Sequence, residues 1–454
     1  MANIYCMSQA PLVPSPPGHA LLGHLPQMLR EGIFPSYLDW RNKHGDILKL
    51  CAPKGNDWYF FAHPDEVEHI LLGSYRAFHK GTLWNRVRRI LGNGLLTNDG
   101  ELWRDHRRTM QPVFSSSRHP DFAATMSGAI AHMVERLRVR AKANEPFDVL
   151  DEMSRVTIQN MGLTLFSRDF ASLYDRMGDE LAFVVRRMNV WNFWKARTAD
   201  PRLYLALRKL HLLIDELIST RRRELDAGAN APDDLLSALL RGRDSQTGKP
   251  FSDRELHDEI LTFIFVGHET TALSLAWTWA MLGQNRDSME RAQSEVDSVL
   301  DGRAATLDDL DRLRIVKNSF LETLRLYPPV WGLARTTTQV VSIRGFAIPK
   351  GATLLTLPYI THRHPDFWPD AQRFDPDRFT PEIEKSRPRY AYFPFGGGPR
   401  LCIGMGFAML EAQLVLSAVL QNFNLKLVEN QKFDLALWAT LRPKHGIRVR
   451  LQAR

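Results

Sequence analysis

Residues 393–404 carry the most information in this sequence, and they read Phe393-Pro394-Phe395-Gly396-Gly397-Gly398-Pro399-Arg400-Leu401-Cys402-Ile403-Gly404. They place one cysteine between a glycine-rich loop and a helix that the apolar pattern predicts from about residue 403 to 423. Backbone amides at a helix N-terminus attract negative charge, so this position favours a thiolate at Cys402. A lone thiolate is a suitable ligand for haem iron, and Arg400 can reach a carboxylate such as a haem propionate. The glycines allow the backbone to approach a flat cofactor closely.

Five positions of this segment follow the spacing Phe-x-x-Gly-x-Arg-x-Cys-x-Gly, namely Phe395, Gly398, Arg400, Cys402 and Gly404. This spacing resembles the haem-binding signature of the cytochrome P450 family, and further motifs of that family follow in the expected order from about residue 15 to 450. The resemblance implies a mainly α fold with a small β region, in which haem b lies between a long oxygen-side helix and the helix of the cysteine loop. It also implies that Cys402 is the axial iron ligand and that Phe395, Arg400 and Gly404 help to bind the haem.

The other two cysteines have simpler interpretations. Cys51 lies in an apolar segment and is predicted to be a small core residue, whereas Cys6 is predicted to be an exposed thiol without a role. Three scattered cysteines are too few for a disulfide framework or a structural zinc site. This usage favours a reducing, cytoplasmic location.

A second motif, Glu322 and Arg325, resembles the Glu-x-x-Arg pair of the same family. The same spacing recurs elsewhere in the chain, so taken alone it also fits an ordinary surface ion pair. A proline turn at residues 327–329 follows it, and residues 374–379 resemble the family's Pro-x-Arg-Phe element. The resemblance implies that Glu322, Arg325 and Arg378 form a buried structural network that holds the cysteine loop, because a buried charge must be paired.

A predicted helix over residues 101–114, with a break at its proline, carries Trp103 and Arg107 on one face. From the residues alone, a core tryptophan and a solvated arginine explain this pattern equally well. The resemblance implies that Trp103, Arg107 and Arg335 join Arg400 in binding the haem propionates.

The long apolar segment 255–284 contains polar groups near its middle, in the sequence Val266-Gly267-His268-Glu269-Thr270-Thr271. Buried polar groups need a reason. We expect Gly267 to open room against a ligand and Thr270 to donate a hydrogen bond to the carbonyl of Val266. The alternative is a satisfied threonine and glutamate inside a helix bundle.

The same segment resembles the family's Ala/Gly-Gly-x-Asp/Glu-Thr-Thr motif. The resemblance implies that Thr270 and Glu269 are the catalytic residues that relay protons to the dioxygen site. Val266 departs from the motif, and its β-branched side chain is expected to narrow the pocket. His268 is expected to be structural, since a second haem ligand would close the oxygen site.

Apolar and aromatic side chains are expected to form the wall of the substrate pocket. By resemblance to the family, they are Leu95, Leu96, Phe263, Phe265, Val266, Val330, Trp331, Leu333 and Trp438. Such a lining favours an apolar small molecule, of terpenoid, steroid or fatty-acyl type, over a sugar or a nucleotide. Near a predicted lid with Trp191, Phe193 and Trp194, Arg186 and Arg187 could bind a carboxylate, although two solvated arginines are the simpler interpretation.

Composition excludes several classes of protein. The 454 residues are 44% hydrophobic and 24% charged, which excludes a disordered or fibrous chain. The 59 basic and 51 acidic residues give a net charge of +8, but no long run of like charges occurs, so nucleic-acid binding is not expected. Residues 261–282 are apolar enough to span a membrane, yet their central His268 and Glu269 predict a buried helix and no spanning segment. No secretory signal is expected, because residues 1–18 lack a basic region followed by an apolar one.

Local patterns predict a proline-rich lead over residues 1–20 and a single domain over residues 21–454. The expected helices cover residues 35–44, 122–142, 149–165, 204–224, 235–240 and 255–284, in addition to the two named above. Strands are expected at 47–51 and 58–62, and Ser252 with Glu255 forms a predicted capping box.

The resemblance implies a haem-dependent monooxygenase that hydroxylates an apolar substrate with O2. Because no flavin or ferredoxin segment follows the last helix, electrons are expected from a separate ferredoxin and ferredoxin reductase. Arg104 and Arg108 could receive such an acidic donor. Two alternatives stay open: a peroxide-using or rearranging haem-thiolate enzyme, and a non-catalytic protein that binds haem or nucleic acid.

Overall fold

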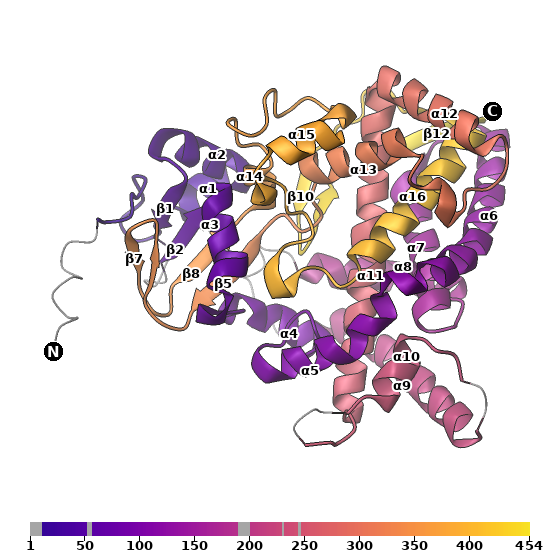
Figure 1. The fold of residues 1–454 in the computed structure, drawn as a ribbon, viewed down its shortest axis with the longest axis horizontal. Coiled ribbons are helices and arrows are strands. Elements are labelled where there is room, and N and C mark those ends of the chain that lie inside the picture. The colour runs from indigo at the N-terminus through magenta and orange to yellow at the C-terminus, as the bar shows by residue number, and fades with distance from the viewer. Residues whose placement is uncertain (1–10, 52–56, 189–199, 229–230, 244–246) are drawn as a thin grey trace. The chain divides into compact units, whose positions relative to one another are not determined.

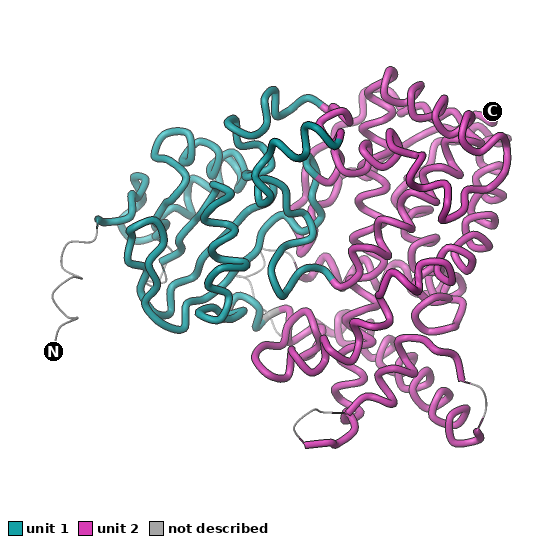
Figure 2. Tube along the Cα trace, viewed as in Figure 1, with its two compact units in different colours: residues 1–85, 325–373, 381–402 teal, residues 86–324, 374–380, 403–454 magenta. Residues whose placement is uncertain are grey.

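The computed structural model describes residues 11–51, 57–188, 200–228, 231–243 and 247–454. Its elements are mostly α-helices with small β-sheets, as predicted (Figure 1). The chain forms two compact units (Figure 2). Unit 1 comprises residues 1–85, 325–373 and 381–402, and unit 2 comprises residues 86–324, 374–380 and 403–454.

Unit 1 contains a five-stranded sheet of order β1-β2-β8-β5-β3. Its strands are β1 (Ile47–Leu50), β2 (Trp58–Phe61), β8 (Thr353–Thr356), β5 (Leu333–Thr337) and β3 (Phe78–His79). β1 and β2 match the predicted strands to within one residue. β2 and β8 pair in parallel, and the other neighbours are antiparallel. This sheet therefore joins segments from opposite ends of the chain.

The remaining elements of unit 1 are short. They are α1 (Leu25–Glu31), α2 (Ile33–His44), α3 (Pro64–Glu68), α14 (Pro358–Thr361), α15 (Pro381–Ser386) and the hairpin β6 (Val341–Ile343) and β7 (Phe346–Ile348). α2 begins two residues before the predicted start, directly after Gly32.

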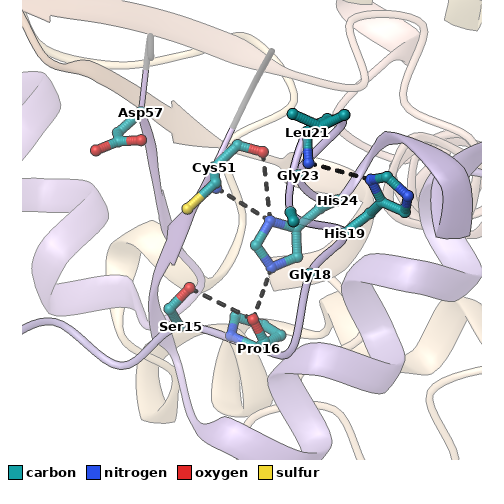
Figure 3. Close-up of a pocket in the computed structure, with 10 residues that line it drawn as sticks. Ser15, Pro16, Gly18, His19, Leu21, Gly23, His24, Cys51 and Asp57 are labelled. Carbon is teal, nitrogen blue, oxygen red and sulfur yellow. Dashed lines mark hydrogen bonds between the residues drawn. The ribbon is translucent and has the colours of Figure 1, made fainter. Parts of the chain in front are cut away.

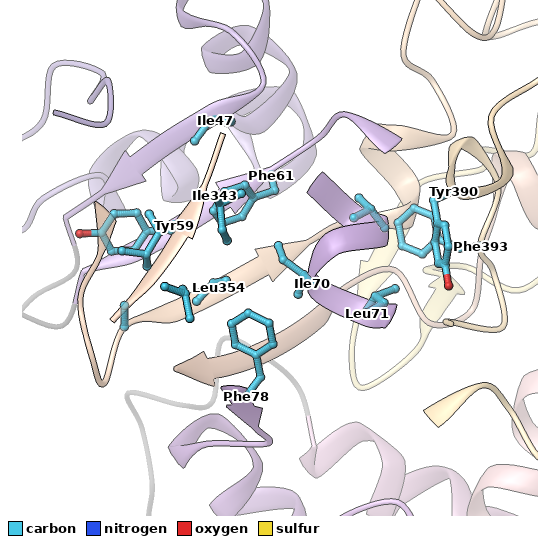
Figure 4. Packing of buried hydrophobic residues seen from close by; sticks show 14 residues of the cluster. Ile47, Tyr59, Phe61, Ile70, Leu71, Phe78, Ile343, Leu354, Tyr390 and Phe393 are labelled. Atoms are coloured by element: carbon cyan, nitrogen blue, oxygen red, sulfur yellow. The ribbon is translucent and has the colours of Figure 1, made fainter. Parts of the chain in front are cut away.

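The core of unit 1 is a cluster of buried aliphatic and aromatic side chains from the sheet, residues 67–71, the β6–β7 hairpin and residues 390–393 (Figure 4). Tyr390 and Phe393 belong to this cluster and are 4% and 3% exposed. They directly precede the glycine-rich loop. The core therefore anchors the start of the segment that carries the cysteine.

Unit 2 is built from helices. They are α4 (Asn85–Leu91), α5 (Gly100–Met110), α6 (His119–Ala143), α7 (Val149–Leu165), α8 (Ala171–Arg187), α9 (Pro201–Asp226), α10 (Leu235–Arg241), α11 (Asp253–Gln284), α12 (Arg286–Leu300), α13 (Arg314–Leu326) and α16 (Met405–Asn422), with the ends of α4 and α13 reaching into unit 1. Apart from the C-terminal end of α5, the predicted helices of this unit agree with these bounds to within three residues. α5 stops before Pro112 and continues as a 3-10 turn over Gln111–Phe114, so the predicted break is confirmed.

The long helix α11 has the predicted capping box. The Ser252 hydroxyl accepts a hydrogen bond from the Glu255 N–H, and the Glu255 carboxylate accepts one from the Ser252 N–H. α11 is the one helix in the described part of the chain that is long and apolar enough to cross a membrane, and most of it is buried inside the protein. Burial on this scale is typical of a core helix.

Small β elements complete unit 2. A three-stranded sheet has the order β4 (Phe147–Asp148), β12 (Arg448–Ala453) and β9 (Phe423–Leu427). A separate hairpin consists of β10 (Leu435–Leu437) and β11 (Leu441–Pro443), with Ala436 paired to Arg442. This hairpin matters for the site, because its turn carries Trp438 and Thr440.

Candidate functional site

The cysteine loop, residues 393–404, is held by hydrogen bonds within itself. The Cys402 N–H donates to the carbonyl of Phe395 at 3.0 Å, and the Gly396 N–H donates to the carbonyl of Phe393 at 2.9 Å. The side chain of Cys402 is exposed. α16 has Gly404 as its N-cap, so the helix begins two residues later than predicted, and the thiol lies just before its N-terminus.

Two glycines of this loop serve its packing on unit 1. Gly398 has a φ of +62°, and a Cβ there would clash with the carbonyl oxygen of Leu71. A Cβ on Gly397 would clash with the ring of Tyr390, whose hydroxyl accepts the Gly398 N–H at 3.2 Å. From the sequence, these glycines were expected to let the backbone approach a flat cofactor closely. The structure shows instead that they let the loop lie against its own unit.

Two other glycines leave open space. A Cβ on Gly396 would have Leu333 as its nearest neighbour at 3.8 Å, and one on Gly404 would meet no heavy atom within 4 Å. The exposed thiol is therefore accompanied by backbone that a flat group can approach. Leu333, a predicted pocket residue, borders the loop.

The residues of the loop fit a haem. A cysteine thiolate is an established kind of haem iron ligand. Arg400 lies in the 3-10 turn Gly398–Arg400, and Arg335 lies on β5 of the same unit, where it is 9% exposed. Guanidinium groups suit the carboxylates of haem propionates, because they bind them through paired hydrogen bonds.

Arg325 supports the cysteine loop through a histidine that the sequence did not reveal. Its guanidinium donates to the carbonyls of His362, Ala371 and Arg373 at 2.9, 2.7 and 3.1 Å. His362 Nε2 in turn accepts a hydrogen bond from the N–H of Phe393 at 2.9 Å. Arg325 is thus two hydrogen bonds away from the first residue of the loop. A lone histidine in an irregular segment gives no sequence signal for this role.

Glu322 and Arg378 form the expected ion pair in unit 2. Arg378 Nε lies 3.4 Å from Glu322 Oε1, which also accepts the N–H of Asp375 at 3.0 Å. Glu322 is 0% exposed, so its charge needs these partners. The prediction of a buried pair is confirmed for these two residues.

α5 presents Trp103 and Arg107 on one face, both partly buried, as its period requires. The Arg107 side chain donates to the side chain of Gln111 at 3.2 Å. Arg104 and Arg108 are exposed, and each forms an ion pair within the helix, with Glu101 and Asp105 respectively. These two arginines remain accessible on the surface of unit 2.

In the middle of α11, one face of the helix is less buried than the rest. Val266, Gly267 and Thr270 are partly exposed in a helix that is otherwise buried here. The Thr270 hydroxyl donates to the carbonyl of Val266 at 3.0 Å, so that prediction is confirmed. Gly267 has a different role from the expected one, because a Cβ there would lie 2.8 Å from the sulfur of Met161 on α7. Its small size allows α7 and α11 to pack closely.

Glu269 is held by two residues that the sequence analysis missed. Its Oε1 accepts hydrogen bonds from the Thr440 hydroxyl at 2.9 Å and from Arg442 Nη1 at 2.7 Å. The side chains of Glu269 and Arg442 are only 9% and 11% exposed. The β10–β11 hairpin therefore fixes the carboxylate that the motif marked as catalytic.

Two guanidinium groups lie over the ring of Trp438. Arg442 and Arg186 stack on its ring at 4.7 and 5.4 Å from the centroid. Arg187 forms an ion pair with Asp200, which explains its charge without a substrate carboxylate. The predicted lid residues Trp191, Phe193 and Trp194 lie outside the described residues.

The remaining predicted wall residues are distributed over both units. Unit 2 holds Phe263, which is 7% exposed and stacks on Phe114 at 5.6 Å, and Phe265, which is 3% exposed. Unit 1 holds Val330 and Trp331, both partly buried. The other wall residues in unit 2 are Leu95 and Leu96, both partly buried.

His268 has the structural role that was expected. Its Nδ1 donates to the carbonyl of Ile264 at 2.5 Å, and burial lowers the pKa of the imidazole. A neutral ring at this position satisfies the backbone of α11 and carries no charge into the core.

An open cavity of about 500 Å³ in unit 1 involves none of the predicted site residues (Figure 3). Cys51 lies on its wall beside His24, whose ring bonds to the backbone of Cys51 and to the carbonyl of Pro16. The prediction that Cys51 is a core residue was wrong: it directly follows the last residue of β1 and is exposed. Cys6 lies outside the described residues.

Comparison with known proteins places the chain among characterised relatives. A family model described as Cytochrome P450 matches residues 13–450. Cyclooctatin synthase of Streptomyces melanosporofaciens is 34% identical over 92% of this chain and 91% of the relative, and cyclooctat-9-en-7-ol 5-monooxygenase of the same organism is 31% identical over 89% and 88%. Pentalenene oxygenase of Streptomyces avermitilis is 31% identical over 96% of each chain.

Proposed function

The chain belongs to the cytochrome P450 family and is a monooxygenase of that family, and we propose that it hydroxylates an apolar, terpenoid-like small molecule with dioxygen. The wall residues that the family places around the substrate are all aliphatic or aromatic in this chain. An apolar lining gains affinity by removing apolar surface from water and offers little to a charged ligand. The relatives named cyclooctat-9-en-7-ol 5-monooxygenase and pentalenene oxygenase, which are terpenoid oxygenases, support the same substrate class.

Cys402 would provide the thiolate ligand that holds the iron of haem b. Its exposed thiol and the open space at Gly396 and Gly404 carry this assignment. When bound, the haem supplies dioxygen activation and electron transfer, and the thiolate donates electron density that favours O–O cleavage. Trp103, Arg107, Arg335 and Arg400 are the proposed propionate ligands, and Phe395 would border the cofactor.

Proton delivery is assigned to two neighbouring residues of α11. The Thr270 hydroxyl donates its proton to the carbonyl of Val266, and rotation about the Cβ–Oγ1 bond would release that proton for transfer to dioxygen. Glu269 is the adjacent proton carrier, and Arg442 with Thr440 keeps its carboxylate in place. The side chain of Val266 limits the space beside Thr270 and so orients the substrate.

Electrons are proposed to come from a separate ferredoxin and its reductase in the cytoplasm. Arg104 and Arg108 are exposed on α5, the helix that carries two of the proposed propionate ligands. An acidic electron donor would be attracted to this surface, and the attraction would weaken with increasing salt.

The absorption spectrum of the dithionite-reduced protein under carbon monoxide tests the ligand assignment. We expect the red-shifted Soret band of a thiolate-ligated haem. Cys402→Ala should lose this band, whereas Cys51→Ala and Cys6→Ala serve as matched controls and should keep it. An unchanged band in Cys402→Ala would contradict the assignment.

The reaction is tested with a panel of cyclic terpenes, terpene alcohols, steroids and fatty acids. We expect a spin-state change with the terpenoids and a hydroxylated product when dioxygen, NADPH, a ferredoxin and a ferredoxin reductase are supplied. Turnover with peroxide but not with this electron supply would favour a peroxide-using enzyme. Binding without any product would favour a non-catalytic haem protein.

A further inference from the structure

Two ionisable side chains are completely buried where α5 meets α11 in unit 2, and the proposed mechanism does not use them. His106 on α5 and Glu259 on α11 are each 0% exposed, and His106 Nδ1 lies 2.5 Å from Glu259 Oε1. Burial lowers the pKa of His106, but the hydrogen bonds and negative charges of Glu259 and Glu255 together outweigh burial, and the pKa is raised. A buried ion pair is expensive to desolvate and is often no more stabilising than apolar residues of the same size. Its presence here therefore needs another reason.

The second carboxylate oxygen of Glu259 holds a loop. Glu259 Oε2 accepts a hydrogen bond from the N–H of Leu95 at 3.0 Å. The preceding residue, Asp258, accepts one from the N–H of Asn93 at 2.7 Å. Two consecutive carboxylates of α11 thus bind the backbone of residues 92–97, the loop that leads into α5.

This loop lies directly on the helix. A Cβ on Gly94 would lie 2.7 Å from the carbonyl oxygen of Asp258, which shows how closely the two backbones approach. Within the loop, the Thr97 hydroxyl donates to the carbonyl of Gly92 at 2.7 Å, so the loop is closed on itself. The hydrogen bonds from Asp258 and Glu259 on α11 therefore position the whole loop, and they are called its anchor below.

Glu259 belongs to the same face of α11 as the proposed substrate and oxygen site. Glu259, Phe263, Val266 and Thr270 are spaced i, i+4, i+7 and i+11, which places them along one stripe of a helix. The backbone of Leu95 is therefore bonded about one helical turn before Phe263. The side chains of Leu95 and Leu96 are partly exposed at this place.

We propose that Glu259, paired with His106, is a positioning residue of the substrate pocket that sets where Leu95 and Leu96 lie beside Phe263. His106 orients the carboxylate through Oε1, and the carboxylate orients the loop through Oε2. Loss of the carboxylate leaves the Leu95 N–H without its acceptor, so the apolar wall can move along α11. The inference rests on the proposed function only in taking these three apolar residues as pocket wall.

Hydrogen–deuterium exchange of the holoenzyme tests the anchor. The Leu95 amide should be protected in the unsubstituted protein, and it should exchange at least tenfold faster in Glu259→Leu. The matched control is Glu255→Gln on the same helix, because Glu255 lies 3.7 Å from the other nitrogen of His106 and is 35% exposed. Glutamine keeps the capping box that Glu255 forms, so this control should exchange at the unsubstituted rate.

The ratio of dissociation constants for imidazole and 4-phenylimidazole tests the pocket role. Both probes bind the haem iron of the holoenzyme through an imidazole nitrogen. They differ only in the apolar phenyl ring of 4-phenylimidazole, which needs space in the pocket. We expect this ratio to change at least fivefold in Glu259→Leu and to stay unchanged in Glu255→Gln. Neither readout needs turnover, so both remain valid if no terpenoid is hydroxylated.

Two results would overturn the inference. If the Leu95 amide is unprotected in the unsubstituted protein, or if its exchange rate is the same in Glu259→Leu, the carboxylate does not hold the loop. Faster exchange with an unchanged ratio would show an anchor without influence on the pocket. If Glu259→Leu does not fold, Glu259→Gln replaces it, with a smaller increase of about threefold in exchange expected because an uncharged acceptor binds more weakly.

Discussion

The carboxyl group of Glu411 on α16 should make the stability of this protein fall as the pH rises. Glu411 is 0% exposed; its Oε1 accepts a hydrogen bond from the Asn160 side chain at 2.8 Å, and its Oε2 has no partner among the described residues. Burial raises the pKa of this carboxyl from 4.5 to about 8. The group is therefore protonated in the folded protein at neutral pH, whereas the unfolded chain releases the proton.

The magnitude follows from linkage between protonation and folding. Because the folded pKa is the higher one, the contribution to stability is complete below pH 4.5 and is lost as the pH rises toward about 8. Each pH unit in this interval changes the free energy of unfolding by about 1.4 kcal/mol, so the whole interval amounts to about 5 kcal/mol. This is a large share of the roughly 5–15 kcal/mol that stabilises a typical domain.

Glu411→Gln isolates this effect, because glutamine is neutral at every pH and keeps an acceptor for Asn160. Equilibrium unfolding in urea should give similar stabilities for both proteins near pH 5, and the variant should become the more stable one by several kcal/mol near pH 8. Glu382→Gln on the exposed α15 is the control and should show no such trend. A difference between Glu411→Gln and the unsubstituted protein that does not vary with pH would refute the reasoning.

Three further predictions concern the site. Thr270→Ala should retain haem and substrate binding but divert reducing equivalents to peroxide, lowering product per NADPH by up to about 100-fold, and tight coupling would contradict the proton role. Arg442→Gln removes the partner of the nearly buried Glu269 carboxylate and should lower the free energy of unfolding in urea by about 3 kcal/mol. The double variant with Glu269→Gln should recover part of this loss, and full additivity of the two changes would contradict the pairing. In the haem-free protein, Gly398→Ala should lose on the order of 1–3 kcal/mol through its positive φ and its clash with backbone, whereas Gly404→Ala should be nearly neutral. Equal stabilities of the two variants would contradict this account.

Helix boundaries and local capping could be predicted because they depend on neighbours in the chain. Val149–Leu165 was predicted residue for residue, and the capping box at Ser252 and Glu255 follows from a spacing of three. The hydrogen bond of Thr270 to the carbonyl four residues earlier is local in the same sense. The cysteine loop could also be identified, because its typed positions lie within ten consecutive residues.

Contacts between distant segments could not be predicted in this way. The pairing of β2 with β8, of Glu269 with Arg442 and of His106 with Glu259 joins residues more than 100 positions apart. Many arginines and glutamates in the chain are equally suitable partners by charge, so residue type does not select among them. Only the packing of α11 against the β10–β11 hairpin and α5 brings the chosen pairs within hydrogen-bond distance.

The packing around the glycines and the burial of Cys51 could not be predicted from local sequence either. A glycine signals that a side chain is excluded, but whether a cofactor or another helix excludes it depends on what packs there, as Met161 does at Gly267 and Tyr390 at Gly397. Cys51 follows an apolar strand and was predicted to be buried, yet the chain leaves the sheet at that residue and exposes it. Local sequence thus determines which elements form and which residues can react, whereas burial, pairing and close approach arise only when segments that are far apart in the chain pack together.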